Sequence, residues 1–362
     1  MPATQNPSRA NLRRPGGLVR PGIAAAHLPV VELDPRTAYD FLTSACNECG
    51  ELEDLLAEDR RWLEESRAAL KIEVGEDEYV DGCSSFTFEI GRMLPGRPEI
   101  RSARNVVDAI DALSDLELTE VMAGELLEDA ELGAVTRRAV DGDLEALRDL
   151  QARLESSKGH PVLPRPMSDL APATRRIVHF WLPRYETIEA RVAHMLERDV
   201  AGRRGDDMAG DPLGFVERAT NGVRVVPEQR IRRIVLAPSY FGRPYNSHTK
   251  VGDVQLICYP IADSSLGSAD RLTPPNSTVR LYRALGDESR LRILKLLAER
   301  DRYLTEIANE LDLSKPTILH HLATLRSAGL VTITEQGKMT YYSLRHDRAK
   351  EAGVELRAFL AR

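Results

Sequence analysis

The chain has 362 residues, of which 42% are hydrophobic and 29% charged, and its formal net charge is -7. This length predicts two or three domains that each bury a core. No apolar run approaches the roughly 18 residues of a membrane span, and we expect no export signal. Four cysteines in such a chain do not suggest a disulfide framework, so we expect a cytoplasmic protein.

The first 30 residues combine arginine, proline and glycine without a continuous apolar segment, and we predict a flexible basic arm at 1–30. Such an arm is either a leader without function or a segment that contacts DNA. Residues 31–262 are expected to form an N-terminal effector or sensor domain. The composition of residues 263–277 is typical of a linker.

Helical patterns dominate this N-terminal domain. One predicted helix starts near Asp34, an N-cap candidate followed by Pro35, and another starts with a capping box of Ser114 and Glu117. The pattern then changes to the β-branched segments "NGVRVV", "RIRRIVLAPS" and "VQLICYPI", which predict three short strands. We therefore expect a mainly α protein with a small β part (α+β), in which a helical N-terminal domain contains a short antiparallel β segment.

Two cysteines, Cys46 and Cys49, form a Cys-x-x-Cys pair on a predicted helix, where residues three apart share a face. Both sulfurs can therefore bind one metal ion or each other. A structural zinc site needs four ligands, and no second Cys-x-x-Cys pair exists. Packing cysteines are the simplest interpretation, with thiol redox sensing and metal binding as alternatives.

Aromatic residues make up 5% of the chain, yet they gather in "APSYFGRPYNSHTKVGDVQLICYP". Together with an arginine and a histidine, they suit the wall of a small-molecule pocket. The alternative is that the rings only cover one face of a hairpin. The candidate residues of an effector pocket are Tyr240, Phe241, Arg243, Tyr245, His248 and Tyr259.

The C-terminal part differs in charge and in pattern from the rest. Residues 277–362 hold 15 Lys and Arg against 11 Asp and Glu, a local charge of +4, and phosphate binding needs a locally basic surface. Four helices and a hairpin are predicted here. Asp287 is the N-cap of the second helix, Ser314 is the N-cap of the fourth, and Gly329 ends that fourth helix. Two helices joined by a short turn, the second with a polar start, fit the major groove of DNA.

The stretch "ALGDESRLRILKLLAE…LTEIANELDLSKPTILHHLATLRSAGLV…GKMTYYSL" resembles the ArsR-type winged-helix repressors of bacteria over about residues 278–345. The resemblance implies a winged helix-turn-helix domain at 278–362 that forms a homodimer and binds double-stranded DNA at a near-palindromic operator. It also implies candidate DNA contacts, which are Ser314, Lys315, Thr317, His320, Lys338 and Thr340. The N-terminal domain loosely resembles uncharacterised regions of long ArsR-type proteins.

The sequence departs from the metal-sensing members of that family. Their Cys-x-Cys pair is matched here by Tyr303 and Thr305, and the last helix carries His346 and Asp347 side by side without a further histidine. We therefore expect no metal site and no cofactor.

These patterns predict a transcriptional repressor whose DNA affinity is controlled by a small-molecule effector in the N-terminal domain. A thiol, redox or metal sensor acting through Cys46 and Cys49 is the first alternative. No phosphate loop, zinc-protease or serine-hydrolase motif is visible, so no catalytic residue is assigned. An enzyme with an appended DNA-binding domain, or a scaffold that only strengthens dimerisation, is an alternative of another class.

Overall fold

The computed structural model describes residues 28–46, 50–75, 89–156, 167–205, 208–267, 272–336 and 339–361. They form two compact units, which meet in the sequence between Asn276 and Ser277. Helices predominate and strands are few, which confirms the expected α+β class. Within the described ranges, every helix is too short or too polar to cross a bilayer.

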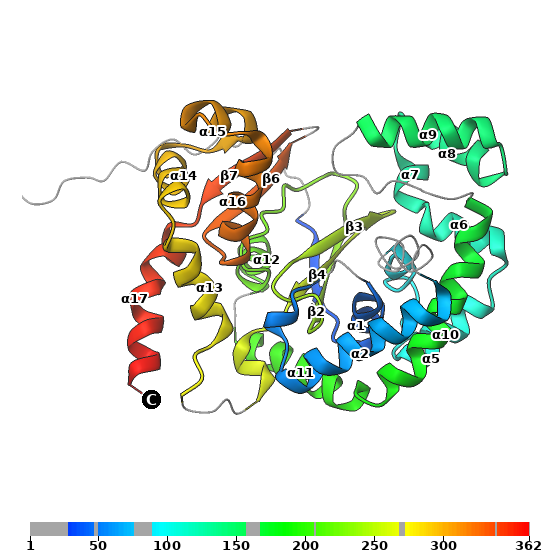
Figure 1. Ribbon diagram of the computed structural model, residues 1–362, viewed down its shortest axis with the longest axis horizontal. Helices are drawn as coiled ribbons and strands as arrows, with labels where there is room; N and C mark the ends of the chain where they lie inside the picture. Colours follow the sequence, from blue (N-terminus) through cyan, green and yellow to red (C-terminus); the bar gives the residue numbers. More distant parts are fainter. Residues whose placement is uncertain are drawn as a thin grey trace, which may run out of the picture. The chain divides into compact units, whose positions relative to one another are not determined.

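A mixed four-stranded sheet runs through the N-terminal unit in the order β1-β2-β4-β3 (Figure 1). The first three of these are parallel, and β3 returns antiparallel to β4, so the expected antiparallel segment is the β3–β4 hairpin. The two parallel pairings were not expected from the sequence. The strands are β1 (Val30–Leu33), β2 (Arg233–Ser239), β3 (Ser247–Val251) and β4 (Val254–Pro260).

Helices make up most of the N-terminal unit, as the periodic patterns predict. The capping box is confirmed, because the Glu117 backbone N–H donates to Ser114 Oγ at 3.3 Å and the Ser114 N–H donates to the Glu117 carboxylate at 2.8 Å. The helices are α1 (Thr37–Ala45), α2 (Ala57–Val74), α5 (Ala103–Asp111), α6 (Asp115–Met122), α7 (Gly124–Glu128), α8 (Gly133–Val140), α9 (Leu144–Ser156), α10 (Leu170–Glu186), α11 (Glu189–Arg203) and α12 (Pro212–Ala219).

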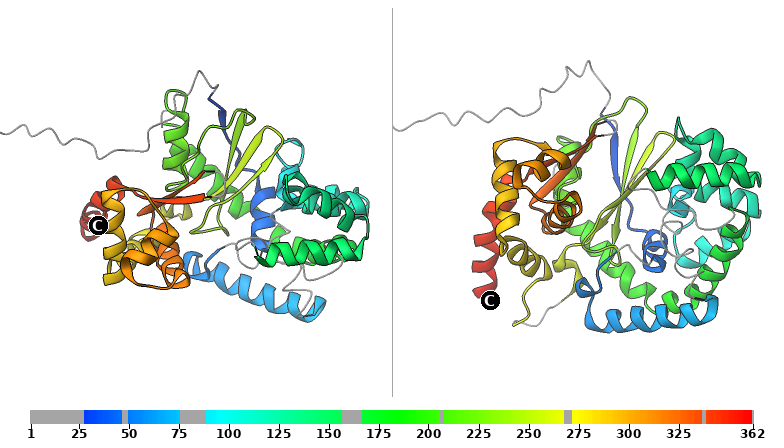
Figure 2. Two further views of the ribbon diagram at one scale, coloured as in Figure 1. Left: turned by 90° about the horizontal axis from the view of Figure 1, so that it is seen from above. Right: turned by 45° about the horizontal axis from the view of Figure 1, so that its top comes forward.

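The sheet is covered on both faces. Because successive side chains of a strand point to opposite faces, β2 contributes Ile234 and Leu236 to one core and Val235 and Ala237 to another. The first core lies under α12, and the second joins the sheet to the larger set of helices that includes α1 and α10. Figure 2 shows the strands between α12 and those helices.

Two local predictions need correction. The segment 221–226 is not a strand, and it begins with a turn in which Asn221 and Gly222 have φ values of 55° and 118°. Helix α1 begins at Thr37 with Arg36 as its N-cap. Asp34 is instead held by the Arg36 guanidinium, whose Nε donates to Asp34 Oδ1 at 2.9 Å.

The expected linker begins later than its composition indicates. Residues Asp263–Leu266 form a 3₁₀ helix that is attached to α11. Asp199 Oδ1 accepts hydrogen bonds from the Ala262 backbone N–H at 2.8 Å and from Ser265 Oγ at 3.2 Å. These residues therefore belong to the ordered N-terminal unit, because a buried carboxylate of α11 satisfies their polar groups.

The C-terminal unit has the predicted order of four helices and a hairpin, closed by a last helix. The sheet of this unit, the second one of the structure, has the strand order β5-β7-β6. The elements are α13 (Asn276–Leu285), α14 (Glu288–Glu299), β5 (Arg302–Tyr303), α15 (Leu304–Leu311), α16 (Lys315–Ser327), β6 (Val331–Gln336), β7 (Met339–Leu344) and α17 (His346–Leu360).

Candidate nucleic-acid interface

Helices α15 and α16 are joined by a turn of three residues, 312–314. Asp312 ends α15 in the left-handed conformation, at φ 54°, and so turns the chain sharply. Ser314 then caps α16, because its Oγ accepts the Thr317 backbone N–H at 3.3 Å. The turn and the cap fix the direction in which the first turn of α16 leaves the unit.

One face of α16 anchors it in the core. Ile318, Leu322 and Leu325, spaced four and three residues apart, are buried together with residues of α14 and α15. At its other end the helix stops at Gly329, which has φ 70° and whose N–H donates to the Arg326 carbonyl at 2.8 Å. The opposite face of α16 therefore points toward solvent in a fixed orientation.

The predicted contacts of α16 lie on that exposed side. Ser314, Lys315, Thr317 and His320 are all exposed, and Ser314 Oγ lies 2.7 Å from Thr317 Oγ1. The structure thus brings four of the six DNA-contact candidates together at the start of one helix. Free backbone N–H groups at a helix start favour anions such as phosphate.

The wing is the β6–β7 hairpin, in which Glu335 lies opposite Thr340. Thr340 is partly exposed on β7, whereas Lys338 lies outside the described residues. The base of the wing is fixed to the unit through β5, because Arg302 pairs with Tyr342 across the ladder and its guanidinium donates to Glu310 at 3.2 Å.

His321 is placed differently from its neighbour His320. Its side chain is only 13% exposed, and its Nδ1 lies 3.9 Å from Asp287 Oδ1, at the start of α14. A hydrogen bond from the Arg290 backbone N–H lowers the pKa of Asp287 below its usual value, so this carboxylate stays ionised beside the histidine. This agrees with a structural role for His321.

The six effector-pocket candidates do not form an open wall. Tyr240, Phe241, Arg243 and Tyr259 are buried, and the hydroxyl group of Tyr240 donates to Asp59 Oδ2 at 2.7 Å. Arg243 donates to the Asp54 carbonyl at 2.9 Å and pairs with Asp263, and Tyr259 donates to Asp199 at 2.9 Å. Tyr245 is 38% exposed and donates to Glu51, and His248 is partly exposed on β3. The aromatic cluster is thus a core whose polar atoms bond to the protein itself.

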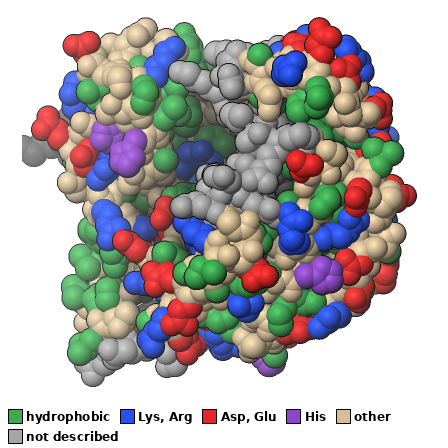
Figure 3. All heavy atoms as spheres, turned by 45° about the vertical axis from the view of Figure 1, so that its right-hand side comes forward, with side chains coloured by type: hydrophobic (Ala, Val, Ile, Leu, Met, Phe, Trp, Pro, Cys, Tyr) green, Lys and Arg blue, Asp and Glu red, His purple; other side chains and the backbone are tan. Residues whose placement is uncertain are grey.

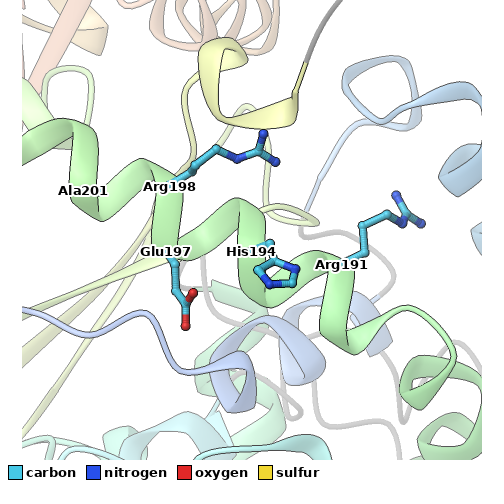
Figure 4. Close-up of a pocket in the computed structure, with 5 residues that line it drawn as sticks. All are labelled: Arg191, His194, Glu197, Arg198 and Ala201. Carbon is cyan, nitrogen blue, oxygen red and sulfur yellow. The ribbon is translucent and has the colours of Figure 1, made fainter.

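A wide-open cavity of about 610 Å³, closer to a surface depression than to an enclosed pocket, lies elsewhere on the N-terminal unit, along the exposed side of α11. Figure 4 shows that its polar side chains leave one helix and that Arg198 reaches toward the 3₁₀ turn at Asp263–Leu266. Arg191 is already engaged, because its NH1 donates to Asp59 Oδ2 at 2.7 Å. The lining residues are Arg191, His194, Glu197, Arg198 and Ala201.

The cysteines are placed only in part. Helix α1 ends at Ala45 and Cys46 follows it with an extended backbone, so the prediction that the Cys-x-x-Cys pair lies on a helix is wrong. Cys46 is buried and forms a disulfide, which the packing interpretation did not anticipate, while Cys49 lies outside the described residues. Cys258 is a free, buried thiol in β4, and burial raises its pKa. Among the described residues, no three His, Cys, Asp or Glu side chains gather as a metal site.

The surface of the molecule carries charges of both signs. Figure 3 shows acidic and basic side chains interspersed over the face that it presents. By contrast, residues 313–334, which contain α16, include Lys315, Arg326 and two histidines but no Asp or Glu. This stretch therefore carries a net positive charge, which suits an anion such as phosphate.

Comparison with known proteins places the C-terminal unit. The family model "bacterial regulatory protein, arsR family" matches residues 287–332. An uncharacterized HTH-type transcriptional regulator of Methanocaldococcus jannaschii is 43% identical over 72 residues, which are 20% of this chain and 81% of that protein. A probable mercury resistance operon repressor of Streptomyces lividans is 30% identical over 28% of this chain and 82% of its own length.

Two further matches are shorter or looser. The arsenical resistance operon repressor of Escherichia coli is 40% identical over 67 residues, 18% of this chain and 57% of the repressor. The solved structure of HlyU from Vibrio cholerae is 28% identical and covers 23% of this chain and 92% of that chain, with a TM-score of 0.20. Each of these matches covers less than 30% of the chain.

Proposed function

The chain belongs, through its C-terminal unit, to the ArsR family of bacterial regulatory proteins, and we propose from this that it is a repressor that binds a specific DNA sequence. The observation that carries the proposal is the exposed start of α16, with Lys315, Thr317 and His320 on a helix whose other face is buried. Helices of this kind enter the major groove by their N-terminal residues, and we call α16 the reader helix, or reader, in this sense.

Each proposed contact has a chemical reason. Lys315 can donate to guanine or to a phosphate, and the Ser314 and Thr317 hydroxyl groups can donate or accept. His320 carries a ring nitrogen for a base edge or a phosphate. In the wing, Thr340 and Lys338 are proposed to contact the sugar–phosphate backbone, which fixes register without reading sequence.

The test is a double variant, Lys315→Ala with His320→Ala, measured on an operator selected from random DNA. We expect binding to weaken by ~1–3 kcal/mol for each base contact that is lost. A matched control removes the same two residue types from exposed positions of the N-terminal unit, Lys71→Ala with His179→Ala. Wild-type affinity of the reader double variant would show that α16 is not the reader.

We also propose a homodimer formed through α13 and α17. These helices pack on each other, since the Tyr282 hydroxyl group donates to the Ala352 carbonyl at 3.0 Å. Together they leave Val279, Val354 and Leu360 exposed at 37%, 56% and 72%, which is more apolar surface than one small unit needs to show. A two-fold dimer presents two readers, so the operator should be near-palindromic, with half-sites one helical turn apart.

The N-terminal unit is proposed to control the reader by binding a small organic effector. The cavity along α11 is a better site for it than the aromatic cluster, because His194 and Arg198 are exposed there while the aromatic polar atoms are already bonded. These side chains favour an anionic effector. Thermal melting with inorganic phosphate and a panel of dicarboxylates, on wild type and on Arg198→Ala, tests the site.

Control by thiol chemistry is the second candidate, and the disulfide at Cys46 is the observation that favours it. Opening or closing that bond at the end of α1 would change the packing of a helix that lies against the sheet. An effector of either kind acts only if it binds the DNA-competent and the incompetent state with different affinity, typically by ~1–3 kcal/mol.

A further inference from the structure

Helix α16 exposes an apolar side chain among the polar residues of its first turns. Leu319 is 43% exposed, although it lies between Lys315 and His320 on the side that points away from the core. Pro316 and Ala323 are exposed as well, and these three residues lie at i, i+3 and i+7, so they form one apolar strip along the helix.

The strip does not help to stabilise the unit. The core of this helix is made by Ile318, Leu322 and Leu325, which are buried on the opposite side. One exposed leucine is ordinary in a protein surface. What distinguishes Leu319 is its position among the polar residues at the start of the reader helix, in a stretch that has no acidic side chain. The positive charge of this stretch favours DNA as the surface that covers the apolar strip.

We propose that Leu319 is a specificity-determining residue that contacts the C5-methyl group of one thymine in each operator half-site. The inference rests on the proposed function, because it needs α16 in the major groove. The thymine methyl is the apolar group that a base pair presents there, and apolar side chains recognise it. Adenine and guanine present hydrogen-bonding groups in the major groove that the leucine cannot satisfy, and cytosine carries only a hydrogen at C5 and so lacks the methyl contact.

Sequence patterns did not single out this residue, because an apolar side chain within a helix is usually counted as core. The sequence nevertheless indicates on which side of the helix Leu319 lies. Leu319 lies one residue after Ile318, and a step of one residue rotates a side chain by about 100° around the helix, away from the buried face.

The experiment removes the methyl group from the DNA rather than from the protein. The wild-type protein first selects its operator from a random pool, and each thymine is then replaced by deoxyuridine, which differs only by that methyl. Loss of one buried methyl-sized group, worth ~0.8 kcal/mol, corresponds to a drop in affinity of about fourfold. We expect such a drop at one thymine per half-site, and about 16-fold when both are replaced.

A protein variant completes a double-mutant cycle between the thymine methyl group and the Leu319 side chain. Leu319→Ala should bind the thymine operator more weakly than wild type and should no longer distinguish it from the deoxyuridine operator. Leu144→Ala, at a leucine that is 56% exposed in α9, is the matched control and should keep the full discrimination. Because Leu319 is largely outside the core, unchanged melting temperatures should show that both variants fold.

Two outcomes would overturn the proposal. One is a wild-type protein that binds an operator specifically but tolerates deoxyuridine at every thymine. The other is a Leu319→Ala protein that keeps the same loss on deoxyuridine, which would assign the methyl contact to another residue. Failure of the wild type to select any common sequence would contradict the proposed function itself, so the two failures are distinguishable.

Discussion

Asp40 in α1 binds the backbone of Tyr240 at the end of β2, where its Oδ1 accepts the Tyr240 N–H at 2.7 Å. The same oxygen accepts Ser239 Oγ at 2.6 Å and the Phe241 N–H at 3.2 Å. The carboxyl group is fully buried, so it satisfies a turn that would otherwise leave polar groups unpaired in the core. Burial raises the pKa of Asp40 to about 6.

This buried carboxyl group predicts a pH dependence of stability. Because the pKa rises from 3.8 to about 6 on folding, the folded state prefers the protonated form. The stabilisation that this group contributes is fully present below pH 4 and is lost as the pH rises through 6. At about 1.4 kcal/mol per pKa unit, the total loss in the free energy of unfolding is about 3 kcal/mol.

Asp40→Asn isolates this effect, because the amide keeps an acceptor oxygen and cannot ionise. We expect the free energy of unfolding of wild type minus that of the variant to fall between pH 4 and pH 7. Urea titrations across that range measure it. A difference that does not change with pH would show that the carboxyl group is not titrating in the core.

The wing is expected to contribute charge rather than sequence recognition. Lys338→Ala should weaken binding by a similar factor on the operator and on unrelated DNA. It should also reduce the slope of log affinity against log salt by ~0.9 for each lysine removed. Lys71→Ala on α2, an exposed lysine of the N-terminal unit, is the control and should keep the wild-type slope. A loss confined to the operator would make Lys338 a base reader instead.

The proposed dimer predicts a change of mass when its apolar surface is made acidic. Wild type should be dimeric at micromolar concentration by light scattering, and Val354→Asp with Leu360→Asp should be monomeric because two carboxylates would be buried against each other. Leu116→Asp in α6, at a leucine that is 51% exposed, should remain dimeric. A monomeric wild type, with or without DNA, would exclude this interface.

Substitution of the cysteines tests which kind of signal controls DNA binding. Cys46→Ser with Cys49→Ser and the wild type are titrated on operator DNA with peroxide, dithiothreitol, zinc and a chelator. We expect none of these to change operator affinity in either protein, because control is proposed to act through the α11 cavity. If the wild type responds and the double variant, checked for folding by circular dichroism, does not, thiol sensing replaces the organic effector.

The reader could be recognised from the sequence because its signals are local. Ser314 as N-cap, Gly329 as the stop and the spacing of Ile318, Leu322 and Leu325 all lie within one helix and its ends. Hydrogen bonds and side-chain contacts of a helix reach only three or four residues along the chain. A short stretch of sequence therefore determines both the helix and the side that it buries.

The N-terminal sheet was decided by contacts that no local pattern contains. Strand β1 has four residues, and it pairs in parallel with β2, where Val31 lies opposite Ile234 about two hundred positions later. Such a strand is too short for a periodic signal, and its partner depends on how the intervening helices pack. Composition alone did not distinguish a parallel sheet from a hairpin.

The same distinction between local sequence signals and tertiary contacts applies to the candidate sites. The sequence by itself determined that aromatic residues gather around Tyr240 and that α16 carries basic and polar groups. Only the tertiary structure decided that Tyr240 is buried on Asp59, and that no other described part of the C-terminal unit covers Leu319. The physical reason is that burial depends on what the rest of the chain brings against a side chain, and for these two residues that partner lies far away in the sequence or is absent from the unit.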